Sequence, residues 1–366
     1  MTRIYIIDLE SVETRYTAQW KSHVPKILKA QGHQVHVISG PEDIPSATTP
    51  GAFLNFGGTN IYKSRQVEEI ARLFTAGTIL AGDHFIFTDA WHPGIINLKY
   101  MSSLLNIPVK IHALWHAGSY DPQDFLGRLI GNASWVRHAE KSFFHAIDYN
   151  YFATNFHIEM FVRNLLNDGL DENPWIDEDI ADAVNGKRPY FVRSGWPMEY
   201  MDSLLTPYKG MAKRDLILFP HRIAPEKQVD IFRDLKEQLP QYEFVVCQDQ
   251  QLTKNEYHNL LGESKIVFSA NLQETLGISC YEGALVDAIP MVPDRLSYTE
   301  MYFEGFKYPS HWTLNWDSYL QHRQELCHHI IVTMTHYDKR LVQLRKQTEA
   351  LSERFFSAQE LYTRLQ

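Results

Sequence analysis

The sequence has little cysteine, no surplus of positive charge and no metal-binding pattern. Its three cysteines, Cys247, Cys280 and Cys327, are widely spaced, so no disulfide framework is expected and a reducing compartment is favoured. Lysine and arginine number 35 against 44 aspartate and glutamate residues, which gives a net charge of −9. Nonspecific polyanion binders usually need an excess of Lys and Arg to displace counterions, so this class is disfavoured, although a local basic groove stays open.

Long apolar runs are also absent. No stretch approaches the length of a membrane span, and the chain enters its first expected strand at Arg3 without a basic leader. There is no internal repeat and no low-complexity tract. These features predict a soluble cytoplasmic protein without a membrane partner, and they leave the oligomeric state open between monomer and dimer.

Apolar residues make up 44% of the 366 residues, which is enough for two hydrophobic cores. In the first half, short apolar runs rich in β-branched residues alternate with segments of helical periodicity. Such alternation predicts a parallel sheet with helices on both faces. The expected strands are residues 3–8, 34–39, 52–56, 84–88, 109–114, 149–154 and 190–192, and the expected helices are 16–30, 68–74 and 95–105.

An acidic, irregular stretch at residues 168–185 and a break at 194–197 predict a domain boundary near residue 205. The alternation then restarts. Expected strands are 216–220, 243–247, 265–270 and 289–292, and expected helices are 227–239, 256–261 and a long amphipathic segment at 337–365. We therefore predict an α/β protein with two doubly wound, Rossmann-like domains, residues 1–205 and 206–344. A C-terminal helix at about 345–366 is expected to return to the first domain.

Residues 273–284 (QETLGISCYEGA) form the most informative stretch, because they follow an expected buried strand and open an expected helix. The first backbone N–H groups of such a helix are unpaired and attract anions. Glu274 and Glu282 lie about two helical turns apart near these groups. Gly277, which has no Cβ, would let a ligand approach the backbone closely. Alternatively, the two glutamates are surface carboxylates of a capped helix, or one of them pairs with Arg222.

Arg222 and Lys227 follow another expected strand, five residues apart across a short loop that enters a helix. An arginine fork and a lysine point charge at this place can hold a diphosphate. The plain alternative is a solvated helix start. Because the loop and residues 273–284 follow strands of the same expected sheet, phosphate binding is the favoured interpretation.

Together these motifs resemble the nucleotide-sugar half of retaining glycosyltransferases of the GT-B fold, in particular family 4. The matching features are Arg222, Lys227, the Glu274-x7-Glu282 pair, the strand at 288–290 (AIP) and Glu300, so the similarity covers about residues 190–310. Residues 218–227 (LFPHRIAPEK) and 293–300 (PDRLSYTE) are most similar to enzymes that glycosylate modified nucleobases, either hydroxymethylated bases of phage DNA or queuosine in tRNA. The resemblance implies an α/β fold of the GT-B type, in which two Rossmann-like domains face a central cleft.

The resemblance also implies residue roles at the donor. Arg222 and Lys227 would neutralise the diphosphate leaving group, and Glu282 would accept hydrogen bonds from the ribose hydroxyls. Glu274 would hold the sugar hydroxyls, and the N–H groups of Leu276, Gly277 and Ile278 would hold the sugar or the distal phosphate.

His116, in the loop after a first-domain strand, matches the family histidine near the transferred sugar. The family works without a bound metal or a permanent cofactor, and the one Asp-x-Asp, Asp177 to Asp179, follows no strand and is interpreted as solvated surface. One departure is the first loop, residues 9–15 (LESVETR), which lacks the glycine pair of the family; Gly57-Gly58 could replace it, although a plain turn is the simpler interpretation.

The resulting hypothesis is a retaining glycosyltransferase that moves a sugar from a nucleotide-diphosphate sugar, with UDP-sugar as the expected donor, to a nucleic-acid acceptor. Hydroxymethylated cytosine in bacteriophage DNA is the first candidate for the acceptor, which would make the chain a DNA-modification enzyme. Queuosine in tRNA is the next, followed by a saccharide or lipid. Aromatic residues such as Trp91 and Tyr120 could stack on a base, and basic residues of the first half, among them Arg163, Lys187 and Arg188, could follow its phosphates. Two other classes stay open: a sugar-nucleotide epimerase of GT-B architecture and a non-catalytic nucleic-acid-binding protein.

Overall fold

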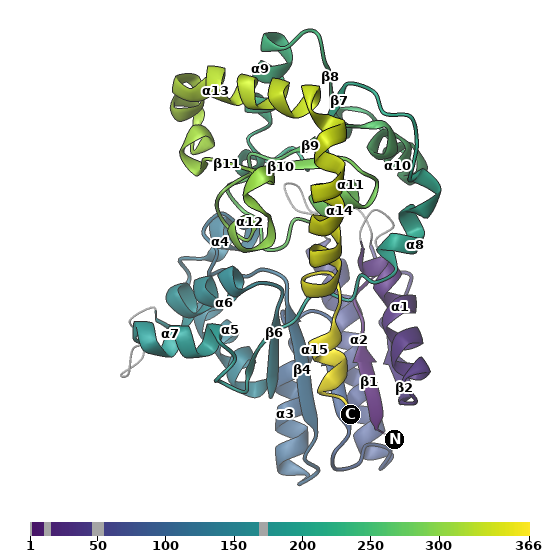
Figure 1. Ribbon diagram of the computed structural model, residues 1–366. Helices are drawn as coiled ribbons and strands as arrows, with labels where there is room; N and C mark the ends of the chain where they lie inside the picture. The colour runs from purple at the N-terminus through teal and green to yellow at the C-terminus, as the bar shows by residue number, and fades with distance from the viewer. Residues whose placement is uncertain (1, 11–15, 46–54, 168–174) are drawn as a thin grey trace. The chain divides into compact units, whose positions relative to one another are not determined.

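The computed structural model describes residues 2–10, 16–45, 55–167 and 175–366 (Figure 1). The chain divides into two compact units, Met1–Pro197 with Ala358–Gln366, and Met198–Ser357. The divisions therefore fall at residues 197 and 357, where the sequence analysis placed them near 205 and 344. The difference arises because α8 (Met201–Leu205) and α14 (Tyr337–Arg354) both contact α11 (Ile278–Leu285) of the second unit.

Unit 1 is built on a parallel sheet whose strands occur in the order β2-β1-β3-β4-β5-β6. The central strands are buried along nearly their whole length, as expected for a parallel sheet covered on both faces. The strands are β1 (Arg3–Ile7), β2 (Gln34–Ile38), β3 (His84–Phe87), β4 (Lys110–Trp115), β5 (Tyr149–Phe152) and β6 (Phe191–Arg193).

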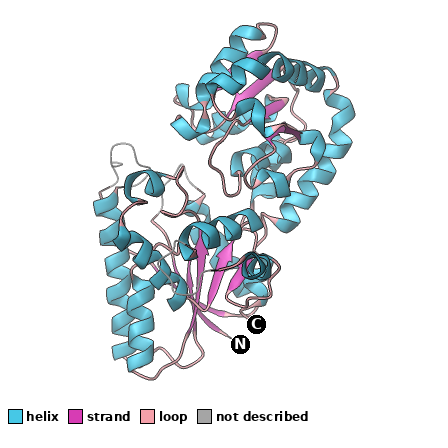
Figure 2. Ribbon diagram, turned by 90° about the vertical axis from the view of Figure 1, so that its left-hand side faces the viewer, coloured by secondary structure: helices cyan, strands magenta, loops and turns pink. Residues whose placement is uncertain are grey.

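Helices flank this sheet, as Figure 2 shows for the strands and helices of each unit. They are α1 (Thr17–Ala30), α2 (Phe56–Thr75), α3 (Gly94–Leu104), α4 (Phe125–Ile130), α5 (Ser134–Ala146), α6 (Asn155–Phe161), α7 (Asp177–Val184) and the C-terminal α15 (Gln359–Thr363). The core between sheet and helices is rich in aromatic rings, including Phe85, Phe87, Trp115 and Phe152, each with no exposed surface.

Unit 2 repeats the architecture with a smaller parallel sheet in the order β11-β10-β9-β7-β8. Its strands are β7 (Leu216–Phe219), β8 (Glu243–Val246), β9 (Ile266–Phe268), β10 (Ile289–Pro293) and β11 (Lys307–Tyr308). Its helices, besides α8, α11 and α14, are α9 (Val229–Gln238), α10 (Lys254–Glu263), α12 (Tyr298–Met301) and α13 (Trp316–Thr335). Strands β7 and β9 are fully buried, so their carboxyl ends deliver the following loops from a rigid base.

Three expected elements differ from the structure. The strand predicted at 52–56 lies mostly outside the described residues, and Phe56 begins α2, because the Asn55 side chain caps the helix by accepting from the N–H of Gly58 at 2.8 Å. Residues 177–184 form α7, with Asp177 and Asp179 in its first turn, where carboxylates are favourable. The single segment predicted at 337–365 is two helices, and of these only α15 belongs to unit 1.

Within the described residues, no helix is both long and apolar enough to cross a membrane.

Candidate functional site

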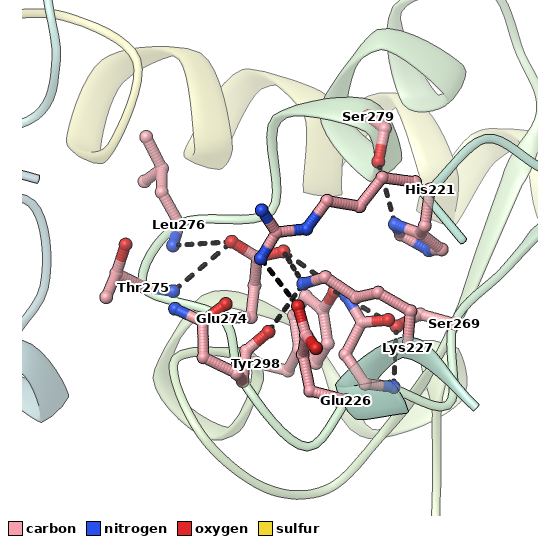
Figure 3. Close-up of polar contacts among 12 residues, drawn as sticks. His221, Glu226, Lys227, Ser269, Glu274, Thr275, Leu276, Ser279 and Tyr298 are labelled. Atoms are coloured by element: carbon pink, nitrogen blue, oxygen red, sulfur yellow. Dashed lines mark hydrogen bonds and ion pairs between the residues drawn. The ribbon is translucent and has the colours of Figure 1, made fainter. Parts of the chain in front are cut away.

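The chemistry-bearing residues of unit 2 gather where β7 and β9 end, on the loops that lead into α9 and α11 (Figure 3). In a parallel sheet these two loops emerge at the same edge, since β7 and β9 are paired neighbours. The β7 loop contributes residues 220–228 and the β9 loop contributes residues 269–277. The two loops contact each other through both backbone and side chains.

Lys227 links the two loops. Its Nζ donates to the carbonyl of Gln273 at 2.6 Å and lies 3.4 Å from Oε2 of Glu274. The Lys227 side chain is 8% exposed, so its positive charge acts in a site with little screening by water. The sequence analysis predicted Lys227 and Glu274 in one site, and the structure brings them together.

The Glu274 carboxylate lies over the start of α11. Its Oε1 accepts from the N–H groups of Thr275 at 3.2 Å and Leu276 at 3.4 Å (Figure 3). Burial raises the pKa of this carboxyl, but Lys227 and the backbone N–H groups of Leu276 and Gly277 outweigh burial, so the pKa lies below its ordinary value. The hydrogen bonds from Thr275 and Leu276 to this carboxylate are the contacts that an anion makes at a helix N-terminus.

Gly277 allows the turn between β9 and α11 to form. Its φ is +73°, a left-handed conformation that favours glycine, and it directly precedes the first residue of α11, Ile278. A Cβ at this position would lie 2.7 Å from a ring carbon of Tyr298. Both the backbone conformation and the close packing therefore require glycine.

His221 supports the same helix from the β7 loop. Burial, with the charge of Lys227, lowers the pKa of His221 to about 3, so the ring is neutral. Its Nε2–H donates to the carbonyl of Phe268 at 3.1 Å, which leaves Nδ1 to accept from the hydroxyl of Ser279 at 3.4 Å. The ring thus ties the end of β9 to the first turn of α11.

Arg222 has a more exposed side chain than Lys227, at 37%, and its Nη2 donates to Oε1 of Glu226 at 2.5 Å. The Glu226 side chain is fully buried. The partner that the structure shows for Arg222 is thus Glu226, a residue of its own loop.

Glu282 lies on α11 and accepts from the Tyr257 hydroxyl of α10 at 2.7 Å. Burial raises the pKa of the Glu282 carboxyl above its ordinary value, although the Tyr257 hydroxyl opposes this shift. Glu282 is only partly buried as a residue, and its second carboxylate oxygen has further acceptor capacity.

His116 belongs to unit 1, in the loop after β4. Its Nε2–H donates to the carbonyl of Thr88 at 2.6 Å, so Nδ1 accepts from the hydroxyl of Tyr16 at 2.7 Å. The rings of Trp20 and Trp196 pack against it, with centroid distances of 5.4 and 4.5 Å. Both nitrogens of the ring are engaged, and one tautomer is fixed.

Several side chains that shape the site in unit 2 were not predicted from the sequence. Tyr257 had no motif to reveal it. Glu226 and Arg295 lie inside the two stretches whose similarity was noted, so their positions were visible and their contacts were not. Among the residues that the structure describes, no group of three or more His, Cys, Asp or Glu side chains is placed to hold a metal ion.

The two parallel-sheet units with helices on their faces define an α/β fold of the GT-B type. No protein-family model matches the chain, and no curated protein matches it. Solved structures do, among them sucrose-phosphate synthase from Thermosynechococcus elongatus, with a TM-score of 0.59 and 11% identity over 100% of this chain and 99% of that chain. The catalytic domain of starch synthase IV from Arabidopsis thaliana, bound to ADP and acarbose, gives a TM-score of 0.56 at 11% identity over the same shares.

HepE from Anabaena, in complex with UDP and glucose, is similar as well, with a TM-score of 0.57 and 14% identity over 99% of each chain. Each match spans both units and almost the whole length of the compared chain. Because the identities are so low, the similarity shows the fold of this chain alone.

Proposed function

We propose that this chain is a glycosyltransferase that uses a nucleotide-diphosphate sugar as donor, with a UDP-sugar as the first choice. The observation that carries the proposal is the arrangement of Lys227 and Glu274 at the N-terminus of α11, on a GT-B fold. A buried cation beside a helix N-terminus is suited to a diphosphate. HepE with UDP and glucose, and the starch synthase with ADP, support the choice of ligand class.

Lys227 and Arg222 would stabilise the diphosphate as it departs. Lys227 is held in place by the Gln273 carbonyl, so it acts as a fixed charge. Arg222 is more exposed, and its planar guanidinium is a group that binds phosphate oxygens. Charges that are fixed before reaction stabilise the transition state without further reorganisation. This role gives the two cations the largest contribution to turnover.

The remaining donor contacts follow the same geometry. Glu282 would accept from the ribose hydroxyls while Tyr257 orients its carboxylate. Glu274 would accept from hydroxyls of the sugar, and the first N–H groups of α11, from Ile278, would face phosphate oxygens. Because the Glu274 carboxylate already accepts from the N–H of Leu276, that N–H would be shared between the carboxylate and the donor.

For the reaction we propose retention of configuration at the anomeric carbon. The bond between that carbon and the leaving phosphate oxygen breaks, and the acceptor oxygen bonds to the same face. The acceptor proton passes to an oxygen of the departing diphosphate. No carboxylate nucleophile is required in this route, unlike the double displacement of retaining glycosidases. His116 would contact the transferred sugar.

For the acceptor we propose a hydroxyl of a modified nucleobase, with hydroxymethylated cytosine in DNA before queuosine in tRNA, and we assign its recognition to unit 1. The support is the similarity of residues 218–227 and 293–300 to nucleobase-modifying enzymes. The structure changes which side chains can contribute. Tyr120 is 1% exposed and bonded to His157 at 2.7 Å, so it is a core residue and cannot stack on a base.

Three of the basic residues considered for a phosphate track are paired with carboxylates. Arg163 contacts Glu159 and Asp177, Lys187 contacts Asp182, and Arg188 contacts Asp179. These ion pairs favour a solvated, charge-balanced surface over a nucleic-acid track. Recognition of the acceptor therefore has to be local to the modified base, which suits a flipped or single-stranded nucleotide.

Incubation of the protein with UDP-glucose, UDP-N-acetylglucosamine, GDP-mannose and ADP-glucose, each with hydroxymethylated DNA, tRNA or no acceptor, tests the proposal. Mass spectrometry of nucleosides should show one new glycosylated nucleoside and release of the matching nucleoside diphosphate. An altered sugar nucleotide in the acceptor-free sample would indicate an epimerase instead. Release of a nucleoside diphosphate without any glycosylated nucleoside would overturn the nucleobase acceptor and keep the glycosyltransferase.

A further inference from the structure

Nearly every peptide group in the loop between β9 and Glu274 forms a hydrogen bond. The N–H of Asn271 donates to the Ser269 hydroxyl at 3.3 Å, and the N–H of Leu272 donates to the Glu226 carbonyl at 2.8 Å. The carbonyl of Gln273 accepts from Lys227. The carbonyls of Ala270 and Asn271 accept from side chains to which sequence reasoning gave no role.

Arg295, in the turn after β10, supplies most of these bonds. Its Nε donates to the Asn271 carbonyl at 2.7 Å and its Nη2 to the Ala270 carbonyl at 2.8 Å. On the other side, Nη1 donates to the Ser310 carbonyl at 2.9 Å and Nη2 to the Thr313 carbonyl at 3.2 Å. All three guanidinium nitrogens therefore bind backbone oxygens, and the planar fork joins the β9 loop to residues 310–313.

Gln228 converges on the same two oxygens from the β7 loop. Its Nε2 donates to the Ala270 carbonyl at 2.6 Å and to the Thr313 carbonyl at 2.7 Å. Gln228 directly follows Lys227 and precedes α9, and it has a left-handed φ of +52°. Ala270 and Thr313 thus each accept from both Gln228 and Arg295.

The charge of Arg295 has a second consequence. Among the residues that the structure describes, its partners are all backbone carbonyls and it forms no ion pair with a carboxylate. Burial lowers the pKa of Arg295, but a guanidinium stays protonated. The positive charge of Arg295 is therefore held against the loop that leads to Glu274 and α11.

We propose that Arg295, assisted by Gln228, is a positioning residue of the nucleotide-sugar site. It fixes the loop of residues 270–274 so that Glu274 and the first N–H groups of α11 keep their geometry, and it adds positive potential toward the phosphates. Its effect on catalysis rests on the proposed function, whereas its fastening of the loop does not. Lysine cannot replace it, because an ammonium has three donors on one nitrogen and cannot span four carbonyls.

The test compares Arg295→Lys, Arg295→Met and Gln228→Ala with Arg340→Lys. Arg340 is a matched control in the same unit, since it also donates to a backbone carbonyl, that of Gly305 at 2.7 Å, but far along the chain from the β9 loop. Hydrogen–deuterium exchange of peptides covering residues 269–278 measures the fastening. Calorimetric titration with UDP and with UMP measures the phosphate site, because the two probes differ only in the second phosphate.

Arg295→Lys should speed exchange in residues 269–278 by about tenfold and lower the ratio of UDP to UMP affinity by about three- to tenfold, while its melting temperature stays near that of Arg340→Lys. Arg295→Met should show the same exchange and a lower ratio, because it also removes the charge. Unchanged exchange in both Arg295 variants would overturn the fastening. Faster exchange with an unchanged ratio would overturn the positioning role. A wild-type protein that binds neither UDP nor UMP would overturn UDP as the nucleotide of the donor, while exchange still decides whether Arg295 holds the loop.

Discussion

The carboxyl edges of the two sheets both carry polar and charged side chains, but the contacts of these side chains differ. At the edge of unit 1, the Asp8 carboxylate accepts from Ser39, Tyr62 and Gln66 at 2.5, 2.6 and 3.1 Å, and Lys63 pairs with Asp89 at 3.2 Å. At the edge of unit 2, Lys227 and Glu274 meet at the N-terminus of a helix, beside the more exposed Arg222. At the first edge the polar side chains bind one another. At the second edge the charged side chains surround the N-terminus of α11.

The same architecture can therefore carry, at the carboxyl edge of its sheet, either polar side chains that bind one another or charged side chains that are arranged to bind an anion. In unit 1 both nitrogens of His116 are bonded within the unit, so a ligand would meet a preset ring. In unit 2 the Glu274 carboxylate occupies backbone N–H groups that a phosphate could share. We therefore expect donor affinity to depend on unit 2 and unit 1 to affect later steps. The following changes test this division, from the largest expected effect to the smallest.

Lys227→Ala should lower kcat by roughly 100- to 1000-fold, because it removes a buried fixed charge from the departing diphosphate. The measurement is the initial rate of UDP release from the UDP-sugar that the wild-type protein turns over. Lys265→Ala is the matched control, since Lys265 pairs with Asp215 before β9, away from the carboxyl edge, and should keep wild-type turnover. Full turnover in folded Lys227→Ala protein would remove Lys227 from the mechanism.

His116→Ala should lower kcat by roughly ten- to a hundredfold and leave UDP affinity within about twofold of wild type, because contact with the sugar counts in the transition state. Steady-state kinetics and UDP titration separate the two effects. His138→Ala, an exposed histidine on α5, provides the comparison and should change neither quantity. An equal loss in UDP affinity and kcat would show that the two edges are not divided as proposed.

Gly277→Ala should destabilise the protein by about 2 kcal/mol or more, because a left-handed alanine costs roughly 1–2 kcal/mol and its Cβ would press on Tyr298. Gly210→Ala isolates the second contribution, since Gly210 has a φ of +72° but open space around its Cβ position. Urea unfolding of both variants measures the difference. Equal losses would mean that the Tyr298 ring moves aside freely.

His221→Gln should reduce the acid sensitivity of stability. The folded pKa of His221, about 3, lies below its ordinary value of 6.5, so its stabilising contribution is complete above pH 6.5 and is lost as pH falls toward 3. Wild-type stability should fall relative to the variant by up to about 1.4 kcal/mol per pH unit over that window. Urea unfolding at pH 7.5 and 5.5 measures it, and parallel losses in the two proteins would contradict the buried neutral ring.

The sequence predicted much of the fold, and it predicted that Lys227 and Glu274 lie close together at one edge of the second sheet. Fully apolar strands such as β7 can be recognised in the sequence, because a parallel sheet that is covered on both faces gives continuous apolar runs. The loops that follow these strands are then located from where the runs end. Phe56 was assigned to a strand because it ends an apolar run, whereas the Asn55 cap decides for helix. The apolar pattern alone therefore does not decide whether Phe56 ends a strand or begins a helix.

Contacts between residues far apart in the sequence could not be predicted, for a different reason. Arg295 donates to the backbone carbonyls of Ala270 and Asn271, about 25 residues earlier. The Tyr257 hydroxyl donates to the carboxylate of Glu282 on the next helix. A guanidinium that binds only carbonyls has no acidic partner in the sequence to suggest it. Tyr120 shows the reverse, since an aromatic ring in a functional-looking loop proved to be core.

The most direct test of the central claim is calorimetric titration of the wild-type protein and Glu282→Ala with UDP, GDP and ADP. We predict saturable binding of at least one nucleotide with a Kd between about 1 μM and 1 mM, the usual range for substrates, and at least about tenfold weaker binding in Glu282→Ala. Absence of saturable binding for all three nucleotides, in protein that is folded, would contradict a nucleotide-sugar site in unit 2.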